Sequence, residues 1–408
     1  MELKTELSLP AVGLTGFEAP LTELEVSVQE TVHRFARDVL RPIGRELDRM
    51  SPEDAIAPGS PYYTVLAKAA ELGMEPSFFE ELEPEVGVRL ESIVGEELGW
   101  GDAGLAIAMG VSSFPLNIAR QSGNAELVDM VKENLTGCWA ITEPDHGTDM
   151  IDFHGEVKAN GASHGTPNLV ARVNGDDFVL SGQKSSWVSC GSIAQAAALF
   201  CSVDMGGDSL TKAVFVVPLD LDGVSRGKPL DKIGQRALNQ GEIFFDDVRI
   251  PRSFMAIPPE GYDQAATMVL TNANTGMGTL FSGVARSACE LAVDYAKERK
   301  QGGVPIIEHQ SVRGRLFEMF RKCEAARSLN RDVVLSNALN EPKLEYAIAS
   351  KVTSTQTAFE VASEALQIFG GNGTSREYPI EKIFRDARSS MIEDGCNYML
   401  DIIGGARL

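Results

Sequence analysis

The chain has few of the residues that build disulfide frameworks and metal sites. Its cysteines are Cys138, Cys190, Cys201, Cys289, Cys323 and Cys396, and its histidines are His33, His146, His154, His164 and His309. No Cys-x-x-Cys pair occurs, and no histidine stands at zinc-ligand spacing from a cysteine. We therefore expect reduced thiols, no bound metal and a cytoplasmic location.

Long apolar runs and positive charges are also scarce. The longest apolar stretches, such as Ala213–Leu219, fall far short of the roughly 20 residues of a membrane-spanning helix. Residues 1–11 show neither the apolar core of a signal peptide nor an arginine-rich amphipathic pattern. With 37 basic and 58 acidic residues, the formal net charge is −21, which repels phosphate backbones and anionic membranes. These shortages argue against a membrane span and against nucleic-acid binding.

The 408 residues, 43% of them hydrophobic, suffice for a large core, and their patterns change twice along the chain. Apolar residues at three- to four-residue spacing predict a helix over 24–40 that ends before Pro42, and more helices over 90–98 and 102–109. The segment 51–61, which contains three prolines, is expected to be a surface loop. The first domain, residues 1–137, is therefore predicted to be helical.

The spacing of apolar residues differs between the middle and the end of the chain. Short apolar runs such as Val214–Val217, separated by turn-forming residues, predict a β domain over 138–255, with one strand over 242–251. Helical periodicity returns from Leu280 with a stripe of small residues that permits close helix packing. It continues over 312–335 and 344–369, so residues 256–408 are predicted to form an antiparallel helical bundle.

Four groups of residues then stand in a specific order. They are Trp139–Asp149 (WAITEPDHGTD), Gly182–Ser189 (GQKSSWVS), Arg299–Gln310, and a C-terminal block with Gln367–Gly373 and Ile392–Gly395. Together they resemble the motifs of the acyl-CoA dehydrogenase family, and the resemblance spans nearly the whole chain. It implies the α+β fold of that family, with an N-terminal helical domain, a central β-barrel or sandwich domain and a C-terminal four-helix bundle. It also implies FAD, a homotetramer and an electron-transfer flavoprotein as electron acceptor.

The resemblance assigns cofactor contacts in each segment. Thr142 would contact the flavin ring, Trp187 would cover it with a broad apolar face, and Ser189 would bond near N5. Arg299 would reach the pyrophosphate of a flavin in the neighbouring subunit, since a guanidinium matches two phosphate oxygens. Further expected contacts are Trp139, Ile141, Thr148, His309, Gln310, Gln367, Gly370, Gly371 and Cys396. Taken singly, these features are also explained by a turn, a core tryptophan, a helix-dipole arginine or a glycine C-cap.

Asp394 is the candidate catalytic base. It stands where the family has a glutamate that abstracts the α-proton of the substrate, and a carboxylate in a water-poor pocket has its pKa raised toward the working pH. Aspartate is shorter than glutamate by one carbon–carbon bond, roughly 1.5 Å, so the substrate or the backbone must lie closer. Ala273, near the other base position known in relatives, has no carboxylate. The alternative is that Asp394 is a surface acid of an inactive protein.

The expected substrate contacts are Thr148, Asn274 and Gly395. Asn274 stands where most relatives carry an arginine, which indicates an unusual acyl group, such as a branched or cyclic one. Asp102 is expected to begin a helix rather than to act as a second base. Residues 151–173 exceed the equivalent family hairpin by roughly a dozen residues and would shape substrate access, contact another subunit or be solvated.

The leading hypothesis is α,β-dehydrogenation of an acyl-CoA thioester, with hydride transfer to flavin N5. One alternative is a flavin oxidase of the nitroalkane-oxidase type, because Asp394–Asn397 and Lys300–Val312 resemble that group. Thr142–Pro144 and Gly147–Asp149 are closer to the dehydrogenases. Another alternative is a catalytically silent flavoprotein subunit.

Overall fold

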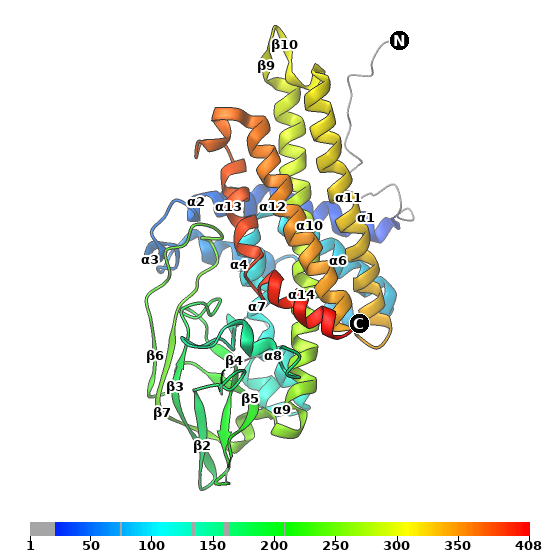
Figure 1. Ribbon diagram of the computed structural model, residues 1–408. Coiled ribbons are helices and arrows are strands. Elements are labelled where there is room, and N and C mark those ends of the chain that lie inside the picture. Colours follow the sequence, from blue (N-terminus) through cyan, green and yellow to red (C-terminus); the bar gives the residue numbers. More distant parts are fainter. Residues whose placement is uncertain (1–20, 74–75, 133–134, 158–160, 162, 208) are drawn as a thin grey trace.

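Helices at both ends of the chain flank a central β-sheet (Figure 1). The computed structural model describes residues 21–408 except 74–75, 133–134, 158–160, 162 and 208. Helices precede Gly137, the sheet follows, and long helices occupy the last third, so the predicted α+β fold class is confirmed. None of the described helices combines the length and hydropathy that a membrane crossing requires.

The N-terminal part consists of short helices packed on one longer helix, α6. Its elements are α1 (Glu23–Phe35), a π-helical turn (Ala36–Leu40), α2 (Arg41–Leu47), α3 (Pro52–Ala55), α4 (Pro61–Ala70), α5 (Pro76–Glu80), α6 (Pro84–Gly101), α7 (Ala103–Ser112), α8 (Phe114–Ser122) and α9 (Ala125–Met130). A capping box between Thr22 and Glu25 begins α1.

Two local predictions for this part were wrong. The first helix was expected to end before Pro42, yet it continues through the π-helical turn into α2. Arg41 donates its N–H to the Ala36 carbonyl five residues back, and Pro42 falls in the first turn of α2, where its missing N–H is tolerated. The expected loop at 51–61 contains α3, because the Ser51 side chain caps that helix by accepting the Asp54 N–H.

The middle part is an eight-stranded sheet in the order β6-β7-β3-β2-β4-β5-β8, with β1 paired to β4. The strands are β1 (Gly137–Ala140), β2 (Val170–Asn174), β3 (Asp177–Lys184), β4 (Ala196–Asp204), β5 (Thr211–Pro218), β6 (Val224–Arg226), β7 (Ile243–Pro251) and β8 (Met255–Ile257). The β1–β4 and β2–β4 pairs are parallel and the others antiparallel. Strand β4 is buried on both faces, because α8 packs on one side of the sheet and the sheet's own core fills the other.

The C-terminal part contains three long helices and two short ones. They are α10 (Tyr262–Glu298), α11 (Gln310–Leu339), α12 (Leu344–Phe369), α13 (Ile380–Ser390) and α14 (Asn397–Ala406). The hairpin of β9 (Lys300–Gln301) and β10 (Val304–Pro305) lies at the end of the bundle far from the sheet (Figure 1). The bounds of α12 agree with the predicted helix 344–369.

Helix α10 begins well before Leu280, where the apolar pattern first becomes clear. Threonines interrupt that pattern in its first half. Thr267, Thr271 and Thr275 each donate a side-chain hydrogen bond to the carbonyl four residues back, so the helix itself satisfies their hydroxyls. The spacing of apolar residues therefore does not predict this half of the helix.

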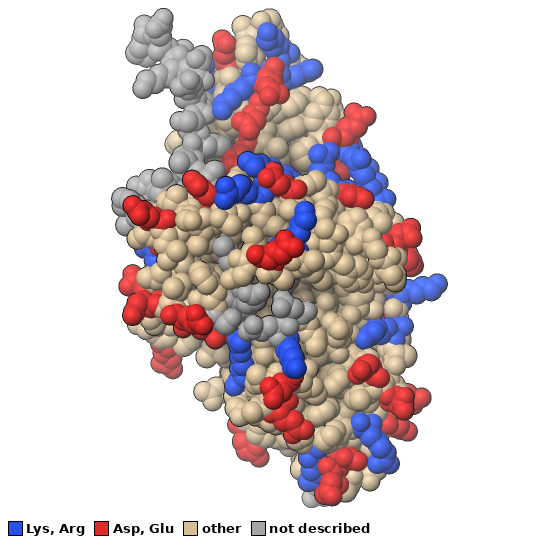
Figure 2. Space-filling model, turned by 180° about the vertical axis from the view of Figure 1, so that it is seen from behind, with Lys and Arg blue, Asp and Glu red and all other residues tan. Residues whose placement is uncertain are grey.

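Acidic and basic side chains are interspersed over the face seen in Figure 2. Among the described residues of that face, no broad basic surface forms. The arrangement agrees with the negative net charge.

The contact of α10 with α6 depends on glycine and can be tested. A Cβ at Gly283 would lie 1.9 Å from the Glu96 carbonyl oxygen. Gly283→Ala is therefore expected to destabilise the protein by about 1–3 kcal/mol. The control is Gly276→Ala on the same helix, where a Cβ would meet nothing within 4 Å and alanine favours the helix. Thermal unfolding of both variants checks this, and equal midpoints would contradict the packing argument.

Candidate active site

Asp394 lies in the turn between α13 and α14, and two helices of the bundle hold that turn. Its φ is +49°, an uncommon conformation for a residue with a side chain, and Gly395 follows at +93°. From α10, Asn274 Nδ2 donates to the Asp394 carbonyl oxygen at 3.2 Å. From α12, Lys351 Nζ donates to the Gly395 carbonyl oxygen at 2.8 Å. The two peptides that follow the Asp394 Cα are thus held by side chains of the bundle, in a turn whose φ at Asp394 is unfavourable for a residue with a side chain.

Lys351 supplies the positive charge that acts on the Asp394 carboxyl group. Its side chain is fully buried. Its ammonium also donates to Asn397 Oδ1 at 2.8 Å. Burial lowers the pKa of Lys351 to about 8, and the Asp394 charge opposes this shift. Burial raises the pKa of Asp394, and the Lys351 charge opposes that shift in turn. The carboxyl therefore combines a raised proton affinity with a nearby cation that stabilises its ionised form.

A second carboxyl group, that of Glu393, directly precedes Asp394. Glu393 is partly buried, and its Oε1 accepts a hydrogen bond from Gln235 Nε2. Burial and, to a lesser degree, the Asp394 charge raise its pKa to about 7, against the opposing charge of Lys232. Burial lowers the pKa of Lys232 to about 8. Two carboxyls and two ammoniums thus meet at this turn.

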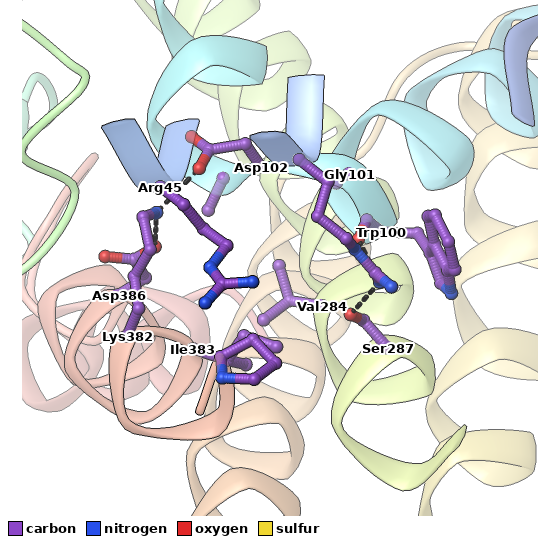
Figure 3. Close-up of a pocket in the computed structure, with 13 residues that line it drawn as sticks. Arg45, Trp100, Gly101, Asp102, Val284, Ser287, Lys382, Ile383 and Asp386 are labelled. Atoms are coloured by element: carbon purple, nitrogen blue, oxygen red, sulfur yellow. Dashed lines mark hydrogen bonds and ion pairs between the residues drawn. The ribbon is translucent and has the colours of Figure 1, made fainter. Parts of the chain in front are cut away.

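Gln235 connects this turn with an ion-pair chain in the bundle. Its N–H donates to Asp386 Oδ1 and its side chain to the Asp386 carbonyl oxygen. Lys382 Nζ lies 2.6 Å from both Asp386 Oδ2 and Asp102 Oδ2. Figure 3 shows Asp102, Lys382 and Asp386 grouped at one side of a small pocket between α2, α6, α10 and α13. Asp102 also caps α7 through the Leu105 N–H, so its predicted role at a helix start is confirmed.

In the β domain the first two motif segments are bonded to each other. Thr142 Oγ1 lies 2.8 Å from Ser185 Oγ, and the Ser185 N–H donates to the Thr142 carbonyl. The Trp187 side chain is 60% exposed, although tryptophan is usually well buried. Gln240 Nε2 holds the adjoining backbone through the Trp187 carbonyl at 3.0 Å and also reaches Ser189 Oγ at 3.3 Å. The indole is therefore presented outward from a fixed segment.

A buried ion pair supports these segments from within. Lys184 Nζ lies 2.7 Å from Glu143 Oε1 and also donates to the carbonyls of Ile141 and Phe200. Burial lowers the pKa of Lys184, while Glu143 raises it. The side chains of Ile141 and Trp139 are buried, and Trp139 stacks on Phe114 at 5.2 Å. Contacts of Trp139 and Ile141 with a cofactor would therefore involve mainly their backbone.

The remaining predicted cofactor residues lie at the other end of the bundle, near the β9–β10 hairpin (Figure 1). They are Arg299, His309, Gln310, Gln367, Gly370 and Gly371. Tyr295 of α10 stacks on Phe369 of α12 at 4.0 Å, which joins the two helix ends that carry these residues. A single chain does not bring this group together with Trp187 and Asp394. Cys396 and Thr148 stay with the Asp394 side, since Cys396 begins α14 and Thr148 begins the 3-10 turn Thr148–Ile151.

The long segment 151–173 packs on the C-terminal helices where the structure describes it. His154 Nε2 lies 3.0 Å from Thr267 Oγ1 of α10, and Glu156 pairs with Arg407 at 2.6 Å. Its first residue, Ile151, lies against the Asp394 turn, because a Cβ at Gly395 would lie 2.5 Å from Ile151 Cδ1. The described part of the segment is thus a contact between the β domain and the bundle.

Sequence reasoning missed Glu393, Gln235, Lys232 and Lys351. Glu393 was visible beside Asp394 in the quoted motif, so an adjacent pair of acids was the available signal. Lys351 lies within a helix among polar residues, where a solvated face is the ordinary expectation. Among the described residues, no group of three or more His, Cys, Asp or Glu side chains could hold a metal ion.

Comparisons with known proteins place the chain in a family. Residues 138–248 match the family model "Acyl-CoA dehydrogenase, middle domain", and residues 260–408 match "Acyl-CoA dehydrogenase, C-terminal domain". The mitochondrial short-chain specific acyl-CoA dehydrogenase of Bos taurus is 28% identical over 400 residues, 95% of this chain and 90% of the relative. The short-chain specific acyl-CoA dehydrogenase of Megasphaera elsdenii is 29% identical over 402 residues, 95% and 99% of the two chains.

The fold agrees with these matches. The structure of butyryl-CoA dehydrogenase from Megasphaera elsdenii superposes with a TM-score of 0.82 at 27% identity, covering 96% of this chain and 99% of that one. The resemblance inferred from the motifs is therefore confirmed. The chain belongs to the acyl-CoA dehydrogenase family of flavin-dependent oxidoreductases.

Proposed function

We propose that the protein binds FAD and catalyses the α,β-dehydrogenation of an acyl-CoA thioester, with Asp394 as the base that removes the α-proton. The arrangement of the Asp394 turn is the observation that carries this proposal. Its carboxyl group is desolvated enough for its pKa to be raised, it has a buried ammonium beside it, and its backbone is held from α10 and α12. A base of this kind can take a proton from a weakly acidic carbon without water competing for it.

The residues present fit a flavin on the β-domain side. Trp187 offers an exposed aromatic face of the kind that covers a planar ring, and Thr142 and Ser189 place hydroxyl groups on neighbouring segments. When bound, the flavin would accept the hydride that leaves the β-carbon. Arg299, His309, Gln310, Gln367, Gly370 and Gly371 would contact the cofactor of another subunit, which supports a homotetramer as the working form. An electron-transfer flavoprotein is the proposed acceptor.

The turn compensates for the short side chain of Asp394. The left-handed conformation of Asp394 gives its side chain a direction that a regular helical residue would not have, and the hydrogen bonds to the Asp394 and Gly395 carbonyls restrain the turn in that conformation. Proton transfer then requires only that the carboxylate be ionised before the step and neutral after it. Lys351 favours the first state, and the desolvated surroundings favour the second.

A short acyl group is the proposed substrate class. Several relatives at 28–29% identity carry short-chain names, and one structural neighbour is a butyryl-CoA dehydrogenase. Thr148, Asn274 and Gly395 are the proposed substrate contacts, and Asn274 in place of an arginine supports an acyl group different from a plain straight chain.

Anaerobic titration of the flavin-loaded protein tests the reaction class. Short-chain acyl-CoA thioesters are expected to remove the absorbance of the oxidised flavin, and nitroalkanes are not. Bleaching by nitroalkanes alone would overturn the proposal in favour of an oxidase. Bleaching by neither class, in a protein whose flavin dithionite still reduces, would favour a silent flavoprotein subunit.

A further inference from the structure

The site contains a carboxyl group that the proposed proton transfer does not use. Glu393 is joined to Asp394 by one peptide bond and remains partly exposed. Among the described residues, Gln235 is its hydrogen-bond partner, and that contact involves only Oε1. The second oxygen, Oε2, therefore retains its capacity to accept a hydrogen bond.

Glu393 is linked through side chains of one loop to Ser189, the predicted flavin contact. Lys232, whose charge acts on Glu393, donates to Gln240 Oε1 at 2.8 Å, and Gln240 Nε2 reaches Ser189 Oγ at 3.3 Å. The loop that carries Gln235, Lys232 and Gln240 thus connects Glu393 with Ser189. On the proposed function, a substrate that lies between Asp394 and a flavin at Ser189 would lie beside this loop.

Asn274 provides an independent sign of a missing hydrogen-bond donor. Its side chain is fully buried, and its Nδ2 donates to the carbonyls of Leu270 and Asp394. Because both partners are acceptors, the amide nitrogen must face them, and Oδ1 must point away. In the described part of the chain, no donor reaches Oδ1. Buried polar atoms are normally satisfied, so this oxygen beside the Asp394 turn indicates that a water or a ligand supplies the donor.

The charges of the turn decide what kind of donor fits. Glu393 and Asp394 face Lys232 and Lys351, so two acids are already balanced by two cations. A cationic substituent would disturb this balance, whereas a neutral hydroxyl group would not. A plain hydrocarbon chain beside Glu393 would displace water from Oε2 without offering a hydrogen-bond donor in its place. Such desolvation of a carboxyl oxygen costs free energy of binding.

We infer that the acyl group of the substrate carries a hydroxyl group close to the reacting carbons, and that Glu393 recognises it. This inference rests on the proposed function, because it assigns a substrate class to the same site. Glu393 is then a specificity-determining residue, and Asp394 alone moves the α-proton. The peptide that joins them sets the distance between the hydroxyl and the carbon to be deprotonated.

Three thioesters of nearly equal size test the inference: butyryl-CoA, pentanoyl-CoA and 4-hydroxybutyryl-CoA. Pentanoyl-CoA replaces the hydroxyl of the last by a methyl group. The wild-type protein is expected to favour 4-hydroxybutyryl-CoA over pentanoyl-CoA by at least about tenfold in the rate of anaerobic flavin reduction divided by Kd. Calorimetric binding of the same compounds gives the affinity independently of turnover.

Glu393→Leu and Glu393→Gln are the informative variants. The leucine variant is expected to lose the preference or to reverse it toward pentanoyl-CoA, and the glutamine variant, which still accepts a hydrogen bond, is expected to retain part of it. A wild-type preference for pentanoyl-CoA, or the same ratio in Glu393→Leu as in wild type, would overturn the inference and leave the dehydrogenase proposal standing. If none of the three thioesters reduced the flavin, the proposed function itself would fail, and this inference with it. Equal flavin content shows that the variants are folded.

Discussion

Replacing Asp394 by asparagine is expected to slow the reduction of the bound flavin by an acyl-CoA by about 10³-fold. The amide is nearly isosteric with the carboxylate but cannot take a proton from the α-carbon. The hydrogen bonds of the turn use the backbone carbonyls of Asp394 and Gly395, so they should survive the change. Stopped-flow absorbance under anaerobic conditions measures the rate constant directly.

The control for this experiment is Asp332→Asn, an exposed aspartate on α11. It removes one carboxylate from the same bundle and is expected to leave the reduction rate unchanged. Binding of the acyl-CoA to the Asp394 variant should persist, because the base contributes to the transition state more than to the ground state. An Asp394→Asn protein that reduced its flavin within tenfold of the wild-type rate would exclude Asp394 as the base.

Lys351→Met is expected to move the acidic limb of the pH–rate profile to higher pH and to lower the maximal reduction rate by about 10–100-fold. The ammonium favours the ionised form of Asp394, so its removal raises the pKa of that carboxyl further. More of the base is then protonated at a given pH, and the rate falls first on the acidic side. The loss of the bond to the Gly395 carbonyl also frees the turn, which explains the lower maximum.

The alkaline side of the profile provides a second readout. Lys351 has a pKa lowered to about 8 by burial, so the wild-type protein should lose its charge, and part of its activity, as the pH rises through that value. In Lys351→Met this limb should be absent. Glu393, with a pKa raised to about 7, and Lys232, with a pKa lowered to about 8, also titrate nearby, so the methionine variant is needed to assign the limb.

If Lys351→Met only disturbed the fold, the rate would fall without a shift of the pH profile. The profile therefore separates a structural role of Lys351 from an electrostatic one. Burial disfavours the charged form of Lys351, and methionine has a similar length without the charge, so the fold is expected to tolerate the change. Lys343→Met, at the exposed lysine before α12, is the matched control. An acidic limb of Lys351→Met that coincided with the wild-type limb would show that Lys351 does not act on the base.

How far the sequence predicts this protein depends on the range of the interactions involved. The apolar period of α12 is local, and its bounds were predicted correctly. The threonine-rich half of α10 was missed, because side-chain bonds to the helix backbone replace apolar contacts there. The π-helical turn before Pro42 was missed for a similar reason, since it shifts hydrogen bonds without a distinctive residue pattern.

In the candidate site, too, local motifs could be read from the sequence and long-range contacts could not. Asp394, Trp187 and Thr142 stand in motifs that are readable along the chain. Lys351 reaches a carbonyl 44 residues away, and Gln235 a carboxyl 158 residues away, and no pattern within either segment indicates such a partner. Only the packing of α12 and of the β6–β7 loop against the Asp394 turn reveals what these side chains do.

The Asp394–Gly395 turn also bears on the chemical lifetime of the proposed catalytic residue. Glycine has no side chain to shield its amide nitrogen, and in a flexible peptide that nitrogen attacks a preceding aspartyl carboxyl and converts it to a succinimide. The attack requires rotation about the Asp394 backbone, which the bonds from Asn274 and Lys351 restrain. The same two side chains that hold the proposed base in place would therefore also slow its spontaneous isomerisation.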